Sequence, residues 1–245
     1  MTVIYVLWLR QLKRYLRSRA RVVGSLGQPL LFLLALGFGM GPVFRKAGEG
    51  NYLQFLAPGV VAMTVLFTAI FSGIELIWDR QFGFLKETLV APVPRIQIMI
   101  GRTLGGATVA TLQGLIVVVI AFIAGFRVTN YSGVPLALGF MALIAVMFTA
   151  LGTAAASVLS DFQGFQLVMN FLVMPIFFLS GALFPLAGVL GRIAIVNPLS
   201  YGVDGLRAAL IGVVHFGVVL DLSVLCCLCA VFLGVGSWLF SRIEL

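Results

Sequence analysis

Residues 78–95 read WDRQFGFLKETLVAPVPR and separate two apolar runs that are each long enough to cross a bilayer. After the N-terminal region, this segment is the largest cluster of charge in the chain. Read as a helix up to the Pro-Val-Pro stop, it has an apolar side and a charged side. The apolar side consists of Trp78, Phe82, Leu85 and Leu89. Two interpretations fit: a solvated connecting loop, or a short helix that receives a force from a partner on the aqueous side.

The composition is that of an integral membrane protein. The 245 residues are 61% hydrophobic and 10% charged, whereas a soluble domain carries about 25% charged residues. The net charge of +8 does not indicate nucleic-acid binding, because the basic residues lie at the edges of the apolar runs. Cys226, Cys227 and Cys229 share one apolar run without partner cysteines elsewhere, so they are expected to behave as small apolar residues.

The apolar runs predict an all-α membrane protein with six transmembrane helices in a single domain over residues 1–245. The predicted spans are Pro29–Phe44, Tyr52–Trp78, Ile96–Ala124, Val134–Leu159, Phe162–Phe184 and Phe216–Phe240. The first is short, and its start is placed at Pro29 or nearer Val22. Residues 185–215 are too polar for two further spans. They are interpreted as two short re-entrant or surface helices.

The distribution of Lys and Arg sets the orientation. With the N-terminus inside, eleven basic residues lie on inner segments and five on outer ones. Both termini and residues 78–95 are therefore expected to face the cytoplasm.

Residues 1–27 are predicted to form an amphipathic helix at the membrane surface. One face carries Tyr5, Trp8, Leu9, Leu12 and Leu16, and the other carries Arg10, Lys13, Arg14, Arg17 and Arg21. This separation is typical of a helix whose aromatic residues lie among headgroups and whose arginines contact anionic lipid. The alternative is a basic tail that only sets topology.

Titratable side chains suited to catalysis are scarce. The sequence contains no paired carboxylates, no histidine cluster and no nucleophile beside a base, and its single histidine, His215, is expected at the membrane interface. A phosphate-binding loop needs Gly-Lys followed by Ser or Thr. Here Lys13, Lys46 and Lys86 are followed by Arg, Ala and Glu. We therefore expect no catalytic residue, metal or nucleotide on this chain, and ATP-driven work would require a second polypeptide.

Polar residues recur along two predicted spans. Thr64, Thr68, Ser72, Glu75 and Asp79 follow one another at steps of three or four, as do Gln163, Gln166 and Asn170. They fit a hydrated or substrate-facing groove, and they fit interhelical hydrogen bonding equally well. Gly101-x-x-x-Gly105 and Gly152-x-x-x-Ala156 have the spacing of close helix contacts.

Three segments resemble ABC exporter permeases of the second type. They are LKETLVAPVPR at 85–95 with Arg80 upstream, NPLSYGVDGLR at 197–207 and YLQFLAPG at 52–59. The chain is most similar to the daunorubicin-resistance and nodulation-factor exporter group. The resemblance covers nearly the whole chain, through motifs that are individually loose and jointly specific. Gly83 and Phe84 depart from it, because many relatives carry polar residues there.

The resemblance implies a homodimer or heterodimer of six-span subunits on two cytoplasmic ATPase subunits, which would bind ATP and Mg. Residues 78–95 would be the coupling segment, and its contact residues would be Arg80, Phe82, Leu85, Lys86, Glu87 and Leu89. The N-terminal helix would be the elbow helix, with Trp8, Arg10, Lys13, Arg14 and Arg17 at the membrane interface. Substrate would pass between the protomers, bordered by the first, second and fifth spans.

Individual polar residues can be assigned to this path. Ser72, Glu75, Gln163, Gln166 and Asn170 are candidates for the path itself, and Tyr201, Asp204 and Arg207 for an outer gate. Asp204 and Arg207, three apart, would either pair at that gate or only stabilise their short helix.

The leading hypothesis is the permease subunit of a prokaryotic, ATP-driven exporter in the cell membrane. Its substrate would be amphipathic: a drug, a lipid or a glycolipid. One alternative is a membrane enzyme or assembly factor acting on lipid-linked substrates. Another is a secondary transporter, which would show internal repeats and a charge near mid-membrane.

Overall fold

The structure is a computed structural model, and it describes residues 2–46, 50–85, 88, 93–186 and 188–242. Across these residues every regular element is a helix, which confirms the all-α prediction. The helices are α1 Thr2–Arg17, α2 Arg19–Leu31, α3 Gly37–Gly39, α4 Gly41–Lys46, α5 Tyr52–Phe71, α6 Ile74–Gln81, α8 Arg95–Ile123, α9 Val134–Val158, α10 Phe162–Phe178, α11 Val189–Ala194, α12 Pro198–Ile211 and α13 Val218–Ser241. A π-helical turn, η1 Phe32–Leu36, joins α2 to α3, and a 3₁₀ turn, η2 Tyr131–Gly133, precedes α9.

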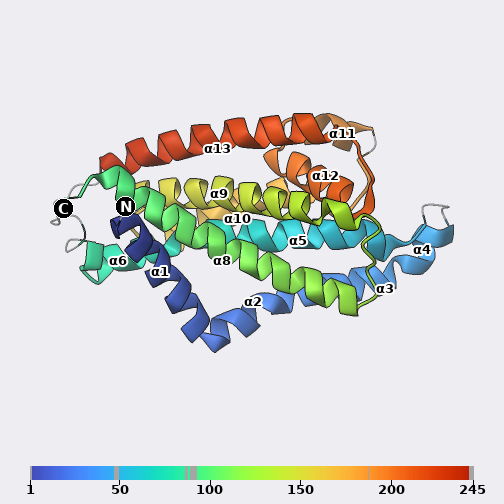
Figure 1. Cartoon of the computed structure of the whole chain (residues 1–245), viewed down its shortest axis with the longest axis horizontal. Coiled ribbons are helices and arrows are strands. Elements are labelled where there is room, and N and C mark those ends of the chain that lie inside the picture. Colours follow the sequence, from blue (N-terminus) through green and yellow to red (C-terminus); the bar gives the residue numbers. More distant parts are fainter. Residues whose placement is uncertain (1, 47–49, 86–87, 89–92, 187, 243–245) are drawn as a thin grey trace.

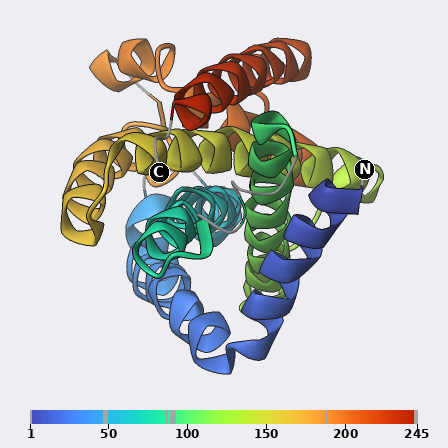
Figure 2. The same ribbon diagram turned by 90° about the vertical axis from the view of Figure 1, so that its left-hand side faces the viewer.

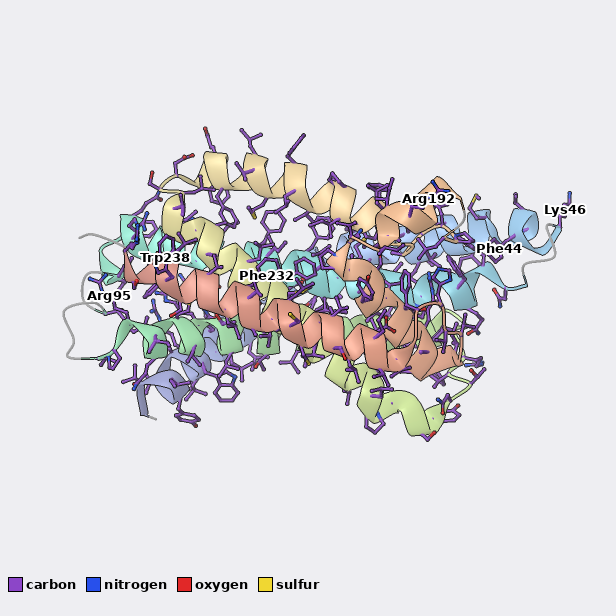
Figure 3. The ribbon with its side chains drawn as sticks, turned by 90° about the horizontal axis from the view of Figure 1, so that it is seen from above. Phe44, Lys46, Arg95, Arg192, Phe232 and Trp238 are labelled. Atoms are coloured by element: carbon purple, nitrogen blue, oxygen red, sulfur yellow. The ribbon has the colours of Figure 1, made fainter. Side chains whose placement is uncertain are left out.

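The long helices α5, α8, α9 and α13 run lengthwise beside one another (Figure 1), and α5 packs against both α8 and α9. Both termini lie at the end that also carries α6, here called the terminal end. The opposite end carries α4, α11 and α12. Seen from above, Arg95 and Trp238 lie at the terminal end, and Lys46 and Arg192 lie at the opposite end (Figure 3).

Five helical stretches are long and apolar enough to span a membrane among the described residues: Val22–Gly39, Tyr52–Gln81, Arg95–Ile123, Tyr131–Val158 and Val218–Ser241. The first starts at Val22, the earlier of the two expected positions. The predicted fifth span corresponds to α10, which is apolar but has only 17 residues. It ends before Phe184 because the chain turns at Gly181, whose φ of +77° suits glycine alone.

The N-terminal segment forms two helices, not one over residues 1–27. Helix α1 ends at Arg17, and Ser18 takes a non-helical conformation with φ −94° and ψ 79°. This break allows α2 to leave α1 at a steep angle (Figure 1) and lead into the first span.

Glycines permit the closest helix contacts, as the small-residue spacing predicts. A Cβ on Gly101 would lie 3.0 Å from the Leu7 Cβ, and one on Gly105 would lie 2.9 Å from the Gln11 Cβ. These two glycines therefore seat α1 against α8, and the two helices lie side by side in Figure 2. Likewise, a Cβ on Gly73 would lie 2.6 Å from the carbonyl carbon of Gly152.

The predicted pair of short helices in 185–215 is present as α11 and α12. Helix α12 contacts α5, α9 and α13, and its residues from Leu199 to Leu210 are buried. It fills the opposite end of the bundle and does not lie on its surface.

Candidate coupling site and groove

The predicted coupling segment is not a single helix. Helix α6 ends at Gln81, and the chain turns at Gly83, where φ is +81°. A left-handed glycine just after a helix is a common helix stop. The expectation of one apolar face is wrong as a result: Phe82 is 75% exposed, whereas Leu85 is 2% exposed and packs in the core. Lys86, Glu87 and Leu89 lie outside the described residues.

Asp79, in the last turns of α6, binds arginines from two other helices. Its Oδ1 accepts a hydrogen bond from the Arg10 Nη2 at 3.0 Å, and its Oδ2 accepts one from the Arg102 Nη2. Asp79 and Arg102 are 3% and 4% exposed. Such burial of charge is tolerated in a protein interior only when the charges are paired.

Arg14 links a second acidic residue, Glu75, to Asp79. Its Nη1 lies 3.8 Å from the Glu75 Oε2 and 3.9 Å from the Asp79 Oδ1. We call Arg10, Arg14, Glu75, Asp79 and Arg102 the charge cluster; it joins α1, α6 and α8.

This arrangement differs from the lipid contacts expected for the elbow arginines. Helix α1 packs on α8 through Leu7 and Tyr15, which are buried. Arg10 and Arg14 lie three and seven positions beyond Leu7, so they share its face and reach the acids of α6. The other predicted elbow residues lie outside the charge cluster. Lys13 and Arg17 are exposed, and the Trp8 Nε1 donates to the Thr108 Oγ1 at 2.9 Å.

Arg80 connects α6 to a further helix. Its Nη2 donates to the carbonyl oxygen of Ser157, near the end of α9, at 3.1 Å. Directly before the turn at Gly83, α6 is thus bonded to α1, α8 and α9.

A groove of about 520 Å³ lies among α1, α2, α5, α6, α10 and one residue of α8. Of the residues proposed for a path, Ser72, Glu75 and Asn170 line it. Gln163 and Gln166 do not; they are exposed on other sides of α10. The groove therefore occupies the space between the first, second and fifth predicted spans.

A polar chain along this groove was missed from the sequence. The Tyr15 hydroxyl donates to the Gln113 Oε1, and the Gln113 Nε2 donates to the Ser25 Oγ at 2.7 Å. Gln113 is fully buried, and Tyr15 and Ser25 line the groove. The detectable signal was Gln113 itself, an amide inside an apolar span that needs a partner.

Asp204 and Arg207, the suggested gate pair, bond to different groups. Arg207 donates to the carbonyl oxygens of Phe55, Gly181 and Ala182, at 2.7 Å for Gly181. The Asp204 carboxylate accepts from the backbone N–H groups of His215 at 2.9 Å and Phe216 at 2.7 Å. The Asp204 and Arg207 side chains, three positions apart on α12, therefore bind two different neighbouring segments.

Arg207 also stacks on an aromatic ring and stays charged. Its guanidinium carbon lies 3.7 Å from the centroid of the Phe55 ring, a cation–π contact. Burial lowers the pKa of Arg207 to about 10, while the Asp204 carboxylate opposes this shift. Tyr201, the third suggested gate residue, donates its hydroxyl to the Ile195 carbonyl oxygen at 2.7 Å. All three side chains hold the opposite end of the bundle together.

Comparison with known proteins gives the family. The sequence profile of the ABC-2 type transporter family matches residues 2–211. The chain is 28% identical over 228 residues to nodulation protein J of Rhizobium leguminosarum bv. viciae, with 91% of this chain and 87% of that protein covered. It is 31% identical over 200 residues to ycf38 of Pyropia yezoensis, covering 78% and 68% of the two chains. With its helical membrane fold and a match over most of its length, the chain belongs to the ABC-2 type transporter family.

Proposed function

We propose that this chain is the permease subunit of an ATP-driven exporter, in which a separate subunit hydrolyses ATP. One observation carries the proposal. The exposed turn at Phe82 lies at the terminal end, and the helix before it is bonded through Asp79 and Arg80 to α1, α8 and α9 beside the groove. A partner that moves this turn would change the walls of the groove.

In the proposed assembly, two copies of a cytoplasmic ABC ATPase bind the terminal end and hold ATP and Mg. A second permease protomer completes the path. The terminal end faces the cytoplasm of a prokaryote, which agrees with the excess of basic residues on the inner segments. Arg80, Phe82 and Leu85 belong to the coupling region. The exposed Phe82 is available to contact the ATPase, and the buried Leu85 anchors the turn to the core.

The groove is the proposed substrate path, with Ser72, Glu75 and Asn170 on its wall. Its apolar and polar lining suits an amphipathic substrate taken from the cytoplasm or the inner leaflet. Tyr201, Asp204 and Arg207 hold the opposite end, where substrate would leave.

Affinity isolation from native membranes tests the proposal. The tagged chain, solubilised gently, should retain a cytoplasmic ATPase subunit identifiable by mass spectrometry. The complex should hydrolyse ATP, and the chain stripped of that subunit should not. Recovery of the chain without any ATPase, under conditions that preserve a known membrane complex, would contradict the proposal.

A further inference from the structure

Two carboxyl groups lie together at the opposite end of the bundle, where α12 packs against the start of α13 (Figure 1). Asp221, in the first turn of α13, is fully buried, and Asp204 of α12 is 3% exposed. The Asp221 carboxyl group lies within hydrogen-bonding reach of the Asp204 carboxyl group. Neither residue lines the groove.

Only one of these two carboxyl groups receives hydrogen bonds. The Asp204 oxygens accept from the backbone N–H groups of His215 and Phe216. Neither oxygen of Asp221 accepts a hydrogen bond from the residues that the structure describes. An ionised carboxylate that is buried without donors is strongly disfavoured. Asp221 therefore requires a bound cation or a proton.

The nearest polar side chains already bond to other groups. On α12, the Arg207 guanidinium and the Tyr201 hydroxyl both donate to backbone carbonyl oxygens. In the turn before α13, His215 is exposed, and its ring lies edge-on to the ring of Phe216. None of these side chains supplies a hydrogen bond to Asp221.

The other helices that pack against α12 and α13 do not supply a positive charge. Helices α9 and α10 contain no titratable residue. From α5, the Tyr52 hydroxyl donates to a backbone carbonyl oxygen, and Tyr131 of η2 is exposed. The two basic residues of α8 are bonded elsewhere, Arg95 at the far end of α13 and Arg102 to Asp79.

The charges of this cluster balance when one proton is present. Arg207 is positively charged and faces Asp204, so it compensates one carboxylate and leaves the second without a partner. A hard metal cation such as Ca²⁺ takes six or more oxygen ligands, and the described residues contain no group of three or more His, Cys, Asp or Glu side chains that could hold a metal. A proton needs only a neutral carboxyl group that donates and a carboxylate that accepts.

We propose that Asp204 and Asp221 bind one proton between them, so that a neutral Asp221 donates its O–H to the Asp204 carboxylate. The shared proton holds the start of α13 against α12. When the proton is lost, two adjacent carboxylates repel each other and this contact weakens. The pair therefore makes the opposite end of the bundle sensitive to pH.

Isotope-edited infrared spectroscopy detects this proton directly. The chain contains four aspartates, at 79, 161, 204 and 221, so aspartate labelled with carbon-13 at its side-chain carboxyl reports on these alone. In nanodiscs at about pH 7, an exposed aspartate is ionised because its pKa is about 3.9, and Asp79 is paired with arginines. We expect the carbonyl band of one neutral aspartate.

Two Asp-to-Asn variants assign the band. D221N should remove it. D161N is the matched control: Asp161 is exposed and caps α10, and asparagine caps a helix equally well. The D161N spectrum should keep the band.

Thermal unfolding separates a neutral Asp221 from an ionised one. Asparagine resembles neutral aspartate in shape and can donate to Asp204, so D221N should keep the parent midpoint at about pH 6. D79N, which removes a carboxylate paired with arginines, should lower the midpoint.

The folded pair holds a proton that an unfolded aspartate has already lost, so the stability of the parent chain should fall as the pH rises. At the pH where the infrared band disappears, the parent midpoint should lie about 2–4 °C below that of D221N. This is the shift that a roughly fivefold change in the unfolding equilibrium causes in a chain of this size.

Absence of a neutral aspartate band in the parent chain, a band that survives in D221N, or destabilisation of D221N equal to that of D79N would overturn the inference. Equal midpoints of the parent chain and D221N after the band has disappeared would show that the proton does not stabilise the contact between α12 and α13. These measurements use no ATPase, so their failure leaves the proposed function standing.

Discussion

Asp79 is a carboxylate in an apolar helix bundle, and arginines from α1 and α8 compensate its charge. A charged side chain in such a place marks a structural or functional requirement. In the sequence, Asp79 directly follows the predicted span Tyr52–Trp78, and Arg102 lies near the start of the predicted span Ile96–Ala124. It cannot show that they meet, because Arg10 and Arg102 are separated from Asp79 by 69 and 23 positions.

Replacing Asp79 with Asn should destabilise the protein strongly. The variant leaves Arg102 buried without its carboxylate, and breaking a buried pair costs about 3–5 kcal/mol. Thermal unfolding in detergent measures the effect. The double variant D79N/R102M, which removes both charges, should recover part of the loss. A single variant as stable as the parent chain would show that the charge cluster does not hold α6.

Arg207 should not tolerate even a lysine. A lysine keeps the charge but cannot reach three carbonyl oxygens and stack on Phe55 at once, so R207K should lose roughly 1.5–3 kcal/mol. The matched control is R192K, at an exposed arginine of the same end, which should leave the unfolding temperature unchanged. Thermal unfolding compares the two, and equal midpoints would refute the structural role of Arg207.

At the scale of elements, the sequence predicts which segments are helical better than it predicts where each helix breaks. The spacing of Gly101 and Gly105 predicts a close contact but not that α1 supplies the partner. The amphipathic pattern of residues 78–90 favours one helix. A glycine with positive φ at Gly83 overrides it, because a local pattern carries no information on where tertiary contacts turn the chain.

The seating of α1 on α8 should fail when Gly105 gains a side chain. G105L would force the Gln11 side chain and α1 outward, at a cost of about 1–3 kcal/mol. The control is G139A, because Gly139 is a helical glycine with open space where a Cβ would lie. This variant should raise the free energy of unfolding by about 0.5–1 kcal/mol. Unfolding midpoints and protease cleavage between α1 and α2 read out both. Unchanged cleavage in G105L would contradict the contact.

Phe82 and Leu85 should respond differently to the same substitution. L85D places a charge at a buried position and should cost about 3 kcal/mol or more. F82D alters an exposed side chain and should change stability by less than about 0.5 kcal/mol. Unfolding curves of the two variants decide; equal destabilisation would mean that both side chains lie on one buried face after all.

At the scale of the whole molecule, hydropathy and the Lys/Arg count predict membrane helices and termini at one end, and the structure places both termini at that end. They do not predict the groove, because its lining comes from segments as distant as Gln11 and Met174. Gln163 and Gln166 illustrate the difficulty. They repeat the spacing of Asn170, yet helix rotation and packing leave them outside the groove.

In the proposed assembly, the partner ATPase changes the shape of the groove by moving the turn at Phe82. ATP hydrolysis by tag-isolated complexes tests it directly, comparing the parent chain with F82D and with Y131D. Tyr131, in η2, is 70% exposed and serves as the matched control, because η2 contacts α12 at the opposite end. We expect F82D to lose the ATPase subunit and its activity while Y131D retains both. Full retention of the subunit and its activity by F82D would contradict the account.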